Sequence, residues 1–508
     1  MRATSTRCGA ALLVTAALVG ACGVRTSPLV ERGHPRDGGI LDARPDAPIE
    51  PARDLGFDSG VPPIPCEADR ECGGGTVCRA PTSFVPVDLA RLALFCEPRT
   101  ALAAADGDAC GGRDSSQCGR GLCVVAGTCV APCISIADCA PGDRCAAVYV
   151  RTDPSSLQPV RACTHIVEAP PGVSRGIDFD VAMSPGGAVP FSVDIAHREL
   201  TTIALFSAQS GEPLLLQSLR DSVGTAVFDA AAVLPGLPAQ SNPVNPYAVG
   251  LTTLLPSGID TAPGRYAAEL MTDGPTAIDR VVLERSDTGA VLDLDLYFVA
   301  GRFAGSADAP ITRELQRALD AFTTFYADIG IRVGAVRTHA LVGGLARGYA
   351  TLEMDADGAI PELDTLFLLT AGARSPSVSW FFVRDAEGVL GVSGGVPGAQ
   401  CMPGTAASGI AISGDIFGSG VALETVLIHE TAHFLGLFHT SELDGTVLDP
   451  FTDTPSCGPD RDANADGFLD PSECVGAGAD NIMFWAAMDP RVFSPSQRAL
   501  VTHALLLQ

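Results

Sequence analysis

Three of the chain's eight histidines share an eleven-residue segment with a glutamate, His429-Glu430-Thr431-Ala432-His433-Phe434-Leu435-Gly436-Leu437-Phe438-His439. Two histidines four positions apart lie on one face of a helix. A glycine three residues later can end that helix and turn the chain, which brings in a third histidine. Three imidazole ligands leave a fourth position on zinc for water, as in catalytic zinc sites. The spacing predicts His429, His433 and His439 as zinc ligands, with Glu430 as general base toward the zinc-bound water.

A second candidate metal site lies at residues 462–473, which have the spacing D-x-N-x-D-G-x5-E of a twelve-residue calcium loop. The expected Ca2+ ligands are side-chain oxygens and one carbonyl oxygen, contributed by Asp462, Asn464, Asp466, Phe468 (carbonyl), Asp470 and Glu473. The alternative is a solvated acidic loop without a cation, because no clear helices flank the segment. Cys457 and Cys474 bracket the loop, and we expect them to form a disulfide that clamps it.

The hydrophobic pattern around the histidines predicts strands and helices in alternation. Residues 292–298 alternate between apolar and polar types, and residues 331–336 and 378–383 are also predicted to be strands. Helical spacing of apolar residues predicts a helix between Pro310 and Gly330. The order of these elements predicts an α/β (α+β) domain with a mixed sheet under helices.

Further predictions concern the elements nearest the histidines. Residues 408–413 are predicted to form a fourth strand, at an edge of the sheet. The glycine-rich residues 391–398 lack the Gly-Lys-Ser/Thr ending of a phosphate loop, and we interpret them as an ordinary loop ahead of that edge strand. Residues 361–372 are predicted to be helical. Ser419 is the expected N-cap of the helix that carries the first two histidines.

Downstream segments resemble those of a known family. Asn481-Ile482-Met483-Phe484-Trp485 resembles the Met-turn of the metzincin zinc metalloproteases, in which the methionine, here Met483, forms an apolar floor beneath the metal. Asp453-Thr454-Pro455 with Cys457, followed by the Met-turn and Phe493-Ser494-Pro495-Ser496-Gln497, has the order of the pappalysin (cytophagalysin-like) group. The resemblance covers residues 291–508. It implies a zinc endopeptidase whose polypeptide substrate lies extended along the edge strand around residues 410–412.

The chain departs from part of that family at Trp485, where some metzincins carry a tyrosine. An indole donates one N–H and is no metal ligand, so only the three histidines and water are assigned to the zinc. The alternative reading of the whole chain is an envelope adhesion or binding protein whose protease domain is a non-catalytic scaffold. Retention of Glu430 argues against that alternative, because an inactive descendant would readily lose this residue.

The N-terminus has the pattern of an export signal. Arg2 and Arg7 precede a short apolar run, which is followed by Val19-Gly20-Ala21-Cys22. The run is too short to span a bilayer as a helix. Its ending resembles a bacterial lipobox, which implies a signal peptide over residues 1–21, lipidation of Cys22 and anchoring in the outer membrane or at the cell surface. The alternative is an ordinary secreted protein.

The remaining N-terminal half divides by composition. Residues 22–65 are rich in Pro, Asp and Gly and are predicted to be a disordered tether. Residues 66–163 contain twelve of the 17 cysteines and are predicted to form a small disulfide-rich module. A zinc ribbon is the alternative there, although C-x2-C pairs are absent. Residues 164–290 alternate in short apolar runs typical of a β-sandwich-like domain. The metalloprotease-like domain follows at 291–508.

The net charge and Cys401 lead to two further expectations. The formal net charge of −26 argues against electrostatic binding to nucleic acid. Contact with a membrane is expected only through the lipid anchor at Cys22. Cys401 is left without a role: it can be free, bridge to the N-terminal module, or supply a thiolate that holds the zinc site latent.

Overall fold

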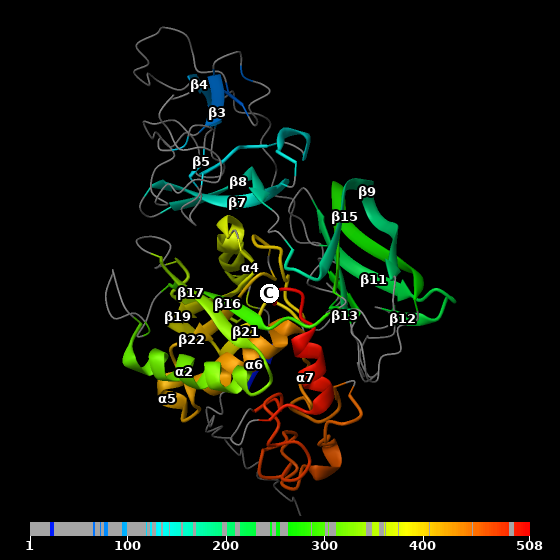
Figure 1. Cartoon of the computed structure of the whole chain (residues 1–508), viewed down its shortest axis with the longest axis vertical. Helices are drawn as coiled ribbons and strands as arrows, with labels where there is room; N and C mark the ends of the chain where they lie inside the picture. The colour runs from blue at the N-terminus through cyan, green and yellow to red at the C-terminus, as the bar shows by residue number, and fades with distance from the viewer. Residues whose placement is uncertain are drawn as a thin grey trace, which may run out of the picture.

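The computed structural model describes residues 21–24, short segments between 65 and 165, most of 169–341 and most of 348–508. Figure 1 shows a cysteine-rich part, a large antiparallel sheet, and an α/β part that contains helix α6 (Leu423–Leu435). The expected signal peptide lies outside the described residues except for Ala21, and so does the expected tether except for its two ends. Among the described residues, no helix combines the length and apolarity that crossing a bilayer requires.

The α/β part is built on a six-stranded mixed sheet with the order β1-β21-β22-β19-β16-β17. Four neighbouring strands run parallel to one another: β17 (Arg332–Ala340), β16 (Val291–Phe298), β19 (Val378–Val383) and β22 (Ile410–Ser413). Strand β21 (Val389–Ser393) runs antiparallel to β22. Its outer side pairs in parallel with β1 (Ala21–Val24), so β21 is the last strand contributed by residues 291–508.

Helices cover both faces of this sheet, as Figure 1 shows for α2 (Arg313–Ala327) below it and α4 (Glu362–Phe367) above it. On one face, the buried leucines of β16 pack with α2 and α6 in a core that includes Phe322 and Trp380. On the other face, Tyr297 and Phe381 pack with α4 and the following 3-10 helix η4 (Leu368–Gly372). Burial on both faces explains the nearly continuous apolar sequence of β19.

Two predictions about elements near the histidines are wrong. Strand β22 lies inside the sheet between β19 and β21, so residues 408–413 do not form its edge. The glycine-rich stretch taken for a loop includes the last part of strand β21. Its glycine at position 391 marks a close backbone approach, because a Cβ there would lie 2.6 Å from Glu430 Cγ and 2.7 Å from Val426 Cγ1.

Helix starts also differ from the predictions. Thr312 caps α2 by accepting a hydrogen bond from the Leu315 N–H, so this helix begins after Thr312. Ser419 is not the N-cap of α6: it ends the short helix α5 (Ile416–Ser419), and Ala422 occupies the cap position without a side-chain hydrogen bond. A left-handed Gly420 separates the two helices, which explains why Ser419 belongs to the first of them.

Among the described residues of 164–290, the strands form one seven-stranded antiparallel sheet, and the predicted sandwich-like arrangement stays a prediction. The 22-residue strand β15 (Gly264–Arg285) pairs along one side with β9 (Val173–Ile195). Its other side is long enough to pair with two strands in succession. The shorter strands are β10 (Thr201–Ala208), β11 (Leu214–Arg220), β12 (Ala226–Asp229), β13 (Val244–Asn245) and β14 (Gly250–Thr253).

The cysteine-rich part consists of small hairpins joined by disulfides. Its described bridges are Cys118–Cys129, Cys133–Cys145 and Cys139–Cys163. Cys133, Cys139 and Cys163 lie close enough to hold a metal, but each is in a disulfide, so these three thiols do not form a zinc ribbon. The elements are β2 (Pro65–Cys66), β3 (Thr76–Arg79), β4 (Leu94–Pro98), β5 (Leu122–Cys123), β6 (Cys129–Val130), η3 (Ile136–Asp138), β7 (Asp143–Asp153) and β8 (Ser156–His165).

Candidate metal centre

Helix α6 and the turn that follows it bring three histidines together. His429 and His433 stand one helical turn apart, and the helix ends at Gly436, whose φ of 120° lies in the region that favours glycine. The chain then returns His439 to the first two. The three Nε2 atoms lie 2.9 Å (His429–His433), 3.0 Å (His429–His439) and 3.1 Å (His433–His439) apart. All three imidazoles therefore converge on one point.

The Nδ1 atom of each histidine has an acceptor, which leaves Nε2 with the lone pair. His429 Nδ1 donates to the Ile482 carbonyl and His433 Nδ1 to the Leu437 carbonyl, both at 2.6 Å. His439 Nδ1 donates to Glu442 Oε2 at 2.9 Å. A carbonyl or carboxylate oxygen only accepts, so each pairing selects the neutral tautomer whose Nε2 can bind a metal.

Burial keeps the first two imidazoles neutral. It is the largest cause that lowers the pKa of His429 to about 3, followed by the neighbouring His439. Burial also lowers the pKa of His433 well below its ordinary value, with further contributions from His429 and His439. Metal binding needs the neutral form, so no proton competes with the metal at these positions near neutral pH.

The donor set and its spacing fit zinc. Tetrahedral zinc holds nitrogens at about 2.0–2.1 Å, which places two such nitrogens about 3.3 Å apart. The three observed separations are a few tenths of an ångström shorter. Imidazole nitrogens suit zinc, whereas calcium and magnesium prefer oxygen ligands. A fourth ligand from the protein is not needed, and the described residues show no cysteine or carboxylate grouped with the three histidines.

Glu430 lies between the histidine helix and the last strand of the sheet. Its side chain is fully buried on α6, directly after His429. The backbone of β21 passes so close at Gly391 that a Cβ there would lie 2.6 Å from Glu430 Cγ. The glutamate therefore has little room to change rotamer. A confined carboxylate directly after a candidate metal ligand fits the general-base role predicted for Glu430.

The turn around Met483 supports two of the three histidines. Met483 is fully buried. The carbonyl before it, of Ile482, accepts from His429, and its own carbonyl accepts from the Thr440 N–H at 2.8 Å, directly after His439. Its N–H donates to Asn481 Oδ1 at 2.8 Å. The turn thus links the first histidine to the segment that carries the third.

Trp485 points toward the acidic loop through its indole N–H. Nε1 donates to the Leu469 carbonyl at 2.8 Å, inside the segment predicted to bind calcium. The Leu469 N–H donates to the Leu443 carbonyl at 2.8 Å, next to the glutamate that holds His439. Leu469 is buried and therefore connects the acidic loop both to Trp485, after Met483, and to the segment of Glu442 that holds His439.

The acidic loop is shaped by hydrogen bonds from its own backbone. Asp462 Oδ2 accepts from the Gly467 N–H, and the side-chain oxygens of Asn464 and Asp466 each accept from an N–H two residues on. The Glu473 carboxylate accepts from Ala463, Asn464 and Asp470. These bonds turn four of the predicted ligand side chains inward. Asp462 Oδ1 is buried and has no hydrogen-bond partner among the described residues, as an oxygen aimed at a cation would be.

A disulfide closes the base of this loop. Cys457 and Cys474 are joined, and both side chains are fully buried. They pack with Leu469, Phe484 and Trp485 in a small core of their own. The bridge therefore connects the ends of the acidic segment to the apolar residues that follow Met483.

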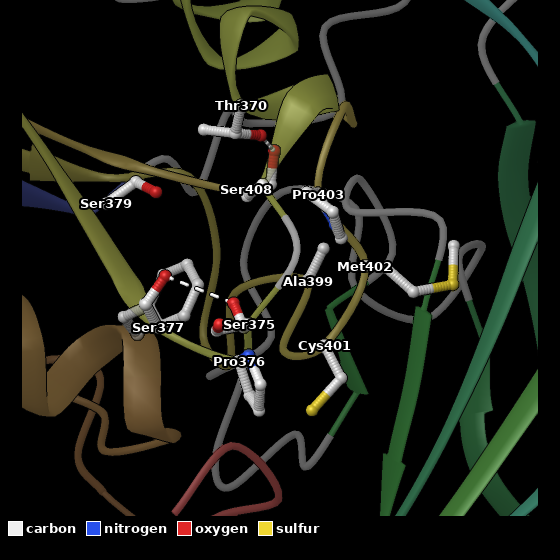
Figure 2. A pocket seen from close by; sticks show the side chains of 12 residues that line it. Thr370, Ser375, Pro376, Ser377, Ser379, Ala399, Cys401, Met402, Pro403 and Ser408 are labelled. Carbon is white, nitrogen blue, oxygen red and sulfur yellow. Dashed lines mark hydrogen bonds between the residues drawn. The ribbon is translucent and has the colours of Figure 1, made fainter. Parts of the chain in front are cut away.

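Cys401 lies away from the histidines. It is buried and is not in a disulfide, and its Sγ donates to the Leu505 carbonyl at 3.6 Å. Figure 2 shows it at the rim of a small pocket that contains the hydroxyls of Ser375, Ser377 and Ser408. In the described structure it forms neither a bridge to the N-terminal module nor part of the three-histidine group.

Two residues of the site, Glu442 and Gly391, are not predicted from the sequence. Glu442 holds His439, and its position three residues after that histidine is the only signal in the sequence. Gly391 sets the approach of β21 to Glu430, but a glycine among other glycines indicates a loop unless its partner on the helix is known. Both roles depend on contacts between distant elements, which local patterns do not encode.

Comparisons with known proteins give limited similarity. Neither a protein-family model nor a curated protein matches this chain. Among solved structures, it is similar to metalloproteinase-II from Bacteroides fragilis, with 11% identity over 44% of this chain and 55% of that chain, and a TM-score of 0.25. The chain thus spans about half of that protein's length. An active-site mutant of a family two carbohydrate esterase from Clostridium thermocellum, in complex with celluohexase, matches with 13% identity over 41% of this chain and 65% of that chain, and a TM-score of 0.11. Scores of this size carry no argument about fold or function.

Proposed function

We propose that the chain is a zinc-dependent endopeptidase of the metzincin type, most similar to the pappalysin group. The observation that carries the proposal is the convergence of three Nε2 atoms within 3.1 Å of one another, each on a ring whose Nδ1 is held by an acceptor, beside the buried Glu430. Such a centre costs little reorganisation when a metal binds, because the imidazoles already have the correct tautomer and orientation.

The chain's own residues divide the chemistry between them. When bound, zinc supplies Lewis acidity toward a peptide carbonyl and makes a water molecule more acidic. Glu430 would accept a proton from the attacking water and deliver it to the leaving amine nitrogen. His429, His433 and His439 would hold the metal. Met483 provides an apolar floor and takes no part in proton transfer.

The substrate side of the proposal concerns strand β21. This strand runs antiparallel to β22 and passes against Glu430 at Gly391. Its outer side pairs with residues 21–24, so it is able to bind an extended main chain. Backbone hydrogen bonds at such an edge recognise a polypeptide independently of its side chains. We therefore infer that a polypeptide substrate binds along β21 in place of β1, at the edge that the sequence had assigned to residues 410–412.

The acidic loop is proposed to bind calcium. The residues fit this ion, since the loop offers carboxylate, amide and carbonyl oxygens and contains a buried carboxylate oxygen, Asp462 Oδ1, without another partner. The proposed ligands remain Asp462, Asn464, Asp466, the Phe468 carbonyl, Asp470 and Glu473. Through Leu469 and Trp485, an ordered loop would support the turn at Met483.

The cellular setting is proposed from the N-terminal sequence. Export with lipidation at Cys22 would place the enzyme in the cell envelope, in the outer membrane or at the cell surface. The disulfides of the cysteine-rich part and of the acidic loop fit an oxidising compartment. Extracellular or envelope proteins are then the accessible substrates.

One experiment tests the proposed function directly. Purified full-length protein is analysed for bound metals and profiled against a peptide library, with and without added calcium. We expect bound zinc and cleavage of internal peptide bonds. Glu430→Ala should retain zinc and lose cleavage, because the histidines are untouched while the base is gone. Glu424→Gln, on the same helix, is the matched control and should cleave normally.

Two results would contradict the proposed function, and they can be told apart by whether zinc binds. If no zinc binds, the metal assignment is wrong. If zinc binds but wild type and Glu430→Ala are equally inert, the domain is a scaffold, and the chain is better described as an envelope binding protein. In that case, deletion of residues 66–290 should abolish binding to a partner while Glu430→Ala leaves it unchanged.

A further inference from the structure

Asp449 occupies a partly buried position between the third histidine and the turn at Met483. Its Oδ1 accepts from Thr454 Oγ1 at 2.5 Å and from the Phe451 N–H at 3.2 Å. Its Oδ2 is buried without a hydrogen-bond partner among the described residues. An ionisable oxygen in that state is costly to keep charged, so its presence calls for a reason beyond packing.

The backbone of Asp449 reaches the zinc site through Thr440. The Asp449 N–H donates to the Thr440 carbonyl at 3.4 Å, and the Thr440 N–H donates to the Met483 carbonyl at 2.8 Å. Thr440 follows His439 directly. Two main-chain hydrogen bonds therefore separate Asp449 from the Met-turn, on the side where the third histidine enters the site.

The side chain of Asp449 approaches the same turn by a second route. Gln497, on α7 (Pro495–Thr502), lowers the pKa of Asp449, and its buried Nε2, like Asp449 Oδ2, has no hydrogen-bond partner among the described residues. Gln497 Oε1 accepts from Asn481 Nδ2 at 2.8 Å, and Asn481 Oδ1 accepts from the Met483 N–H at 2.8 Å. The Met483 carbonyl is thus linked to Asp449 through Thr440, and the Met483 N–H is linked through Asn481 to Gln497, the side chain that lowers the pKa of Asp449.

The charge state of Asp449 is finely balanced by its surroundings. Burial is the largest cause that raises its pKa, to about 7, and the like charge of Asp453 acts in the same direction. Thr454, the Phe451 N–H and Gln497 oppose this shift by donating to, or facing, the ionised form. Asp453 is the one charged neighbour that acts on it among the described residues, and that carboxylate is itself held by Ser494 and Ser496.

We propose that Asp449 is a pH-sensitive positioning residue that holds the Met-turn and the third histidine's segment in register only when it is ionised. It touches neither substrate nor metal. The proposal rests on the proposed zinc peptidase for its catalytic consequence, but the conformational change belongs to the protein alone.

The ionised and protonated forms of Asp449 interact differently with Thr454 and Gln497. The ionised carboxylate attracts the Gln497 amide and the Thr454 hydroxyl, which tightens the link through Asn481 to Met483. Protonation removes that attraction. Because the folded pKa is raised above the ordinary value of 3.8, the native state binds the proton more tightly than the unfolded chain does. This group's contribution to stability is therefore fully present at low pH and is lost as the pH rises from about 4 to about 7.

Trp485 reports on this change without metal or substrate. The chain has two tryptophans, and Trp485 follows Met483 by two residues. We would follow the emission of the metal-free full-length protein from pH 5 to pH 9, with Trp485→Phe subtracted to isolate this signal. Wild type should show a transition with a midpoint near pH 7, and Asp449→Asn should show none. The melting temperature of wild type should fall relative to Asp449→Asn between pH 4 and pH 7.

Two neighbouring variants test the assignment even if Asp449→Asn fails to fold. Asp453→Asn removes the like charge and should move the midpoint to lower pH. Thr454→Val removes a donor to the ionised form and should move the midpoint to higher pH. Shifts in these opposite directions identify Asp449 as the titrating group. A transition that persists in Asp449→Asn, or that neither neighbour moves, would overturn the proposal.

The catalytic consequence is measured on the zinc-loaded protein. Wild-type kcat should fall about tenfold below pH 7 with little change in KM, at the lower end of what groups behind metal ligands contribute. Asp449→Asn should have the lower kcat at every pH, because an amide cannot ionise. If zinc binding or cleavage is absent altogether, the proposed function fails, while the Trp485 titration still decides the role of Asp449.

Discussion

The two candidate metal sites of this chain are built in opposite ways. The histidine site is almost entirely buried, and its side chains are held by residues from other segments, such as Ile482 and Glu442. The acidic loop is largely exposed, and its side chains are held by N–H groups within the same twelve residues. The first site is preorganised by tertiary packing and the second by local turns. The first should therefore tolerate loss of its metal, whereas the second should depend on it for order.

The two sites are nevertheless in contact, and Leu469 makes two of the hydrogen bonds between them. Leu469 belongs to the acidic loop, accepts from Trp485 and donates to the Leu443 carbonyl. Leu469 of the acidic loop therefore contacts both Trp485, two residues after Met483, and Leu443, next to the Glu442 that holds His439. This contrast predicts that substitutions near the histidines act on catalysis or zinc affinity directly, while substitutions in the loop act through calcium.

The largest expected effect on kcat is that of Gly391→Ala, at the buried histidine site. The new methyl group would meet Glu430 Cγ at 2.6 Å and Val426 Cγ1 at 2.7 Å, so Glu430 must move. A displacement of about 1 Å at a catalytic group costs about 10²-fold in kcat. Zinc affinity should stay unchanged, because no histidine is contacted. Steady-state kinetics and metal analysis measure the two quantities.

The control for that variant is Gly418→Ala, at a position where a Cβ meets nothing within 4 Å. It should be as active as wild type. Equal activity of Gly391→Ala and wild type would show that β21 does not confine Glu430. The histidine site would then not be rigid.

Calcium removal should reveal the opposite behaviour in the acidic loop. At a calcium concentration 100 times the Kd, binding should stabilise the folded protein by about 2.7 kcal/mol. Asp462→Asn should lose most of this gain, because Asp462 supplies the buried oxygen that lacks another partner. Asp460→Asn, exposed and just outside the loop, should keep it. Thermal unfolding with and without calcium measures the difference, and equal unfolding of all three proteins in both conditions would leave the loop a solvated turn.

The comparison also shows what local sequence patterns can predict. Strand β19 coincides with its predicted range, residues 378–383, because its run of apolar residues is continuous and short. The structure has a capping box at Ser494 and Gln497, a motif whose Ser-x-x-Gln spacing is visible in four consecutive residues. The grouping of His429, His433 and His439 follows from helical spacing and one helix-ending glycine.

Sequence patterns failed where distant segments decide the outcome. The glycines of residues 391–398 favour a loop, so local patterns miss the end of β21, whereas the close approach of Glu430 requires the glycine at position 391. The pattern predicts residues 408–413 at the edge, because nothing in the local sequence shows that β21 pairs with β22. Asp449 gave no signal at all, because its importance comes from Thr440, Thr454 and Gln497, which lie on three different segments.

A smaller effect is expected at the one histidine whose partner is a charged side chain. Glu442→Ala removes the acceptor of His439 Nδ1. Loss of such a group behind a metal ligand costs about 10–100-fold in metal affinity. Glu442→Gln keeps an acceptor oxygen and should recover part of the loss, while Asp444→Ala, two residues away and exposed, should have no effect on zinc. Competition with a chromophoric chelator gives the affinities. Equal zinc affinity in Glu442→Ala and wild type would mean that packing alone orients His439.

The smallest expected effect tests the connection between the two sites. Trp485→Phe keeps most of the buried ring but removes the N–H that the Leu469 carbonyl accepts, at a cost of about 1 kcal/mol. More importantly, it should uncouple the sites. In wild type, zinc should bind more tightly when calcium is present, and by thermodynamic linkage calcium should bind more tightly when zinc is present by the same factor. In Trp485→Phe this factor should move toward one while each metal still binds. Titration of each metal in the presence and absence of the other measures the factor. An unchanged factor would assign the coupling to other contacts between the segments, such as the hydrogen bonds from Leu469 to Leu443 and from Cys457 to Ser441.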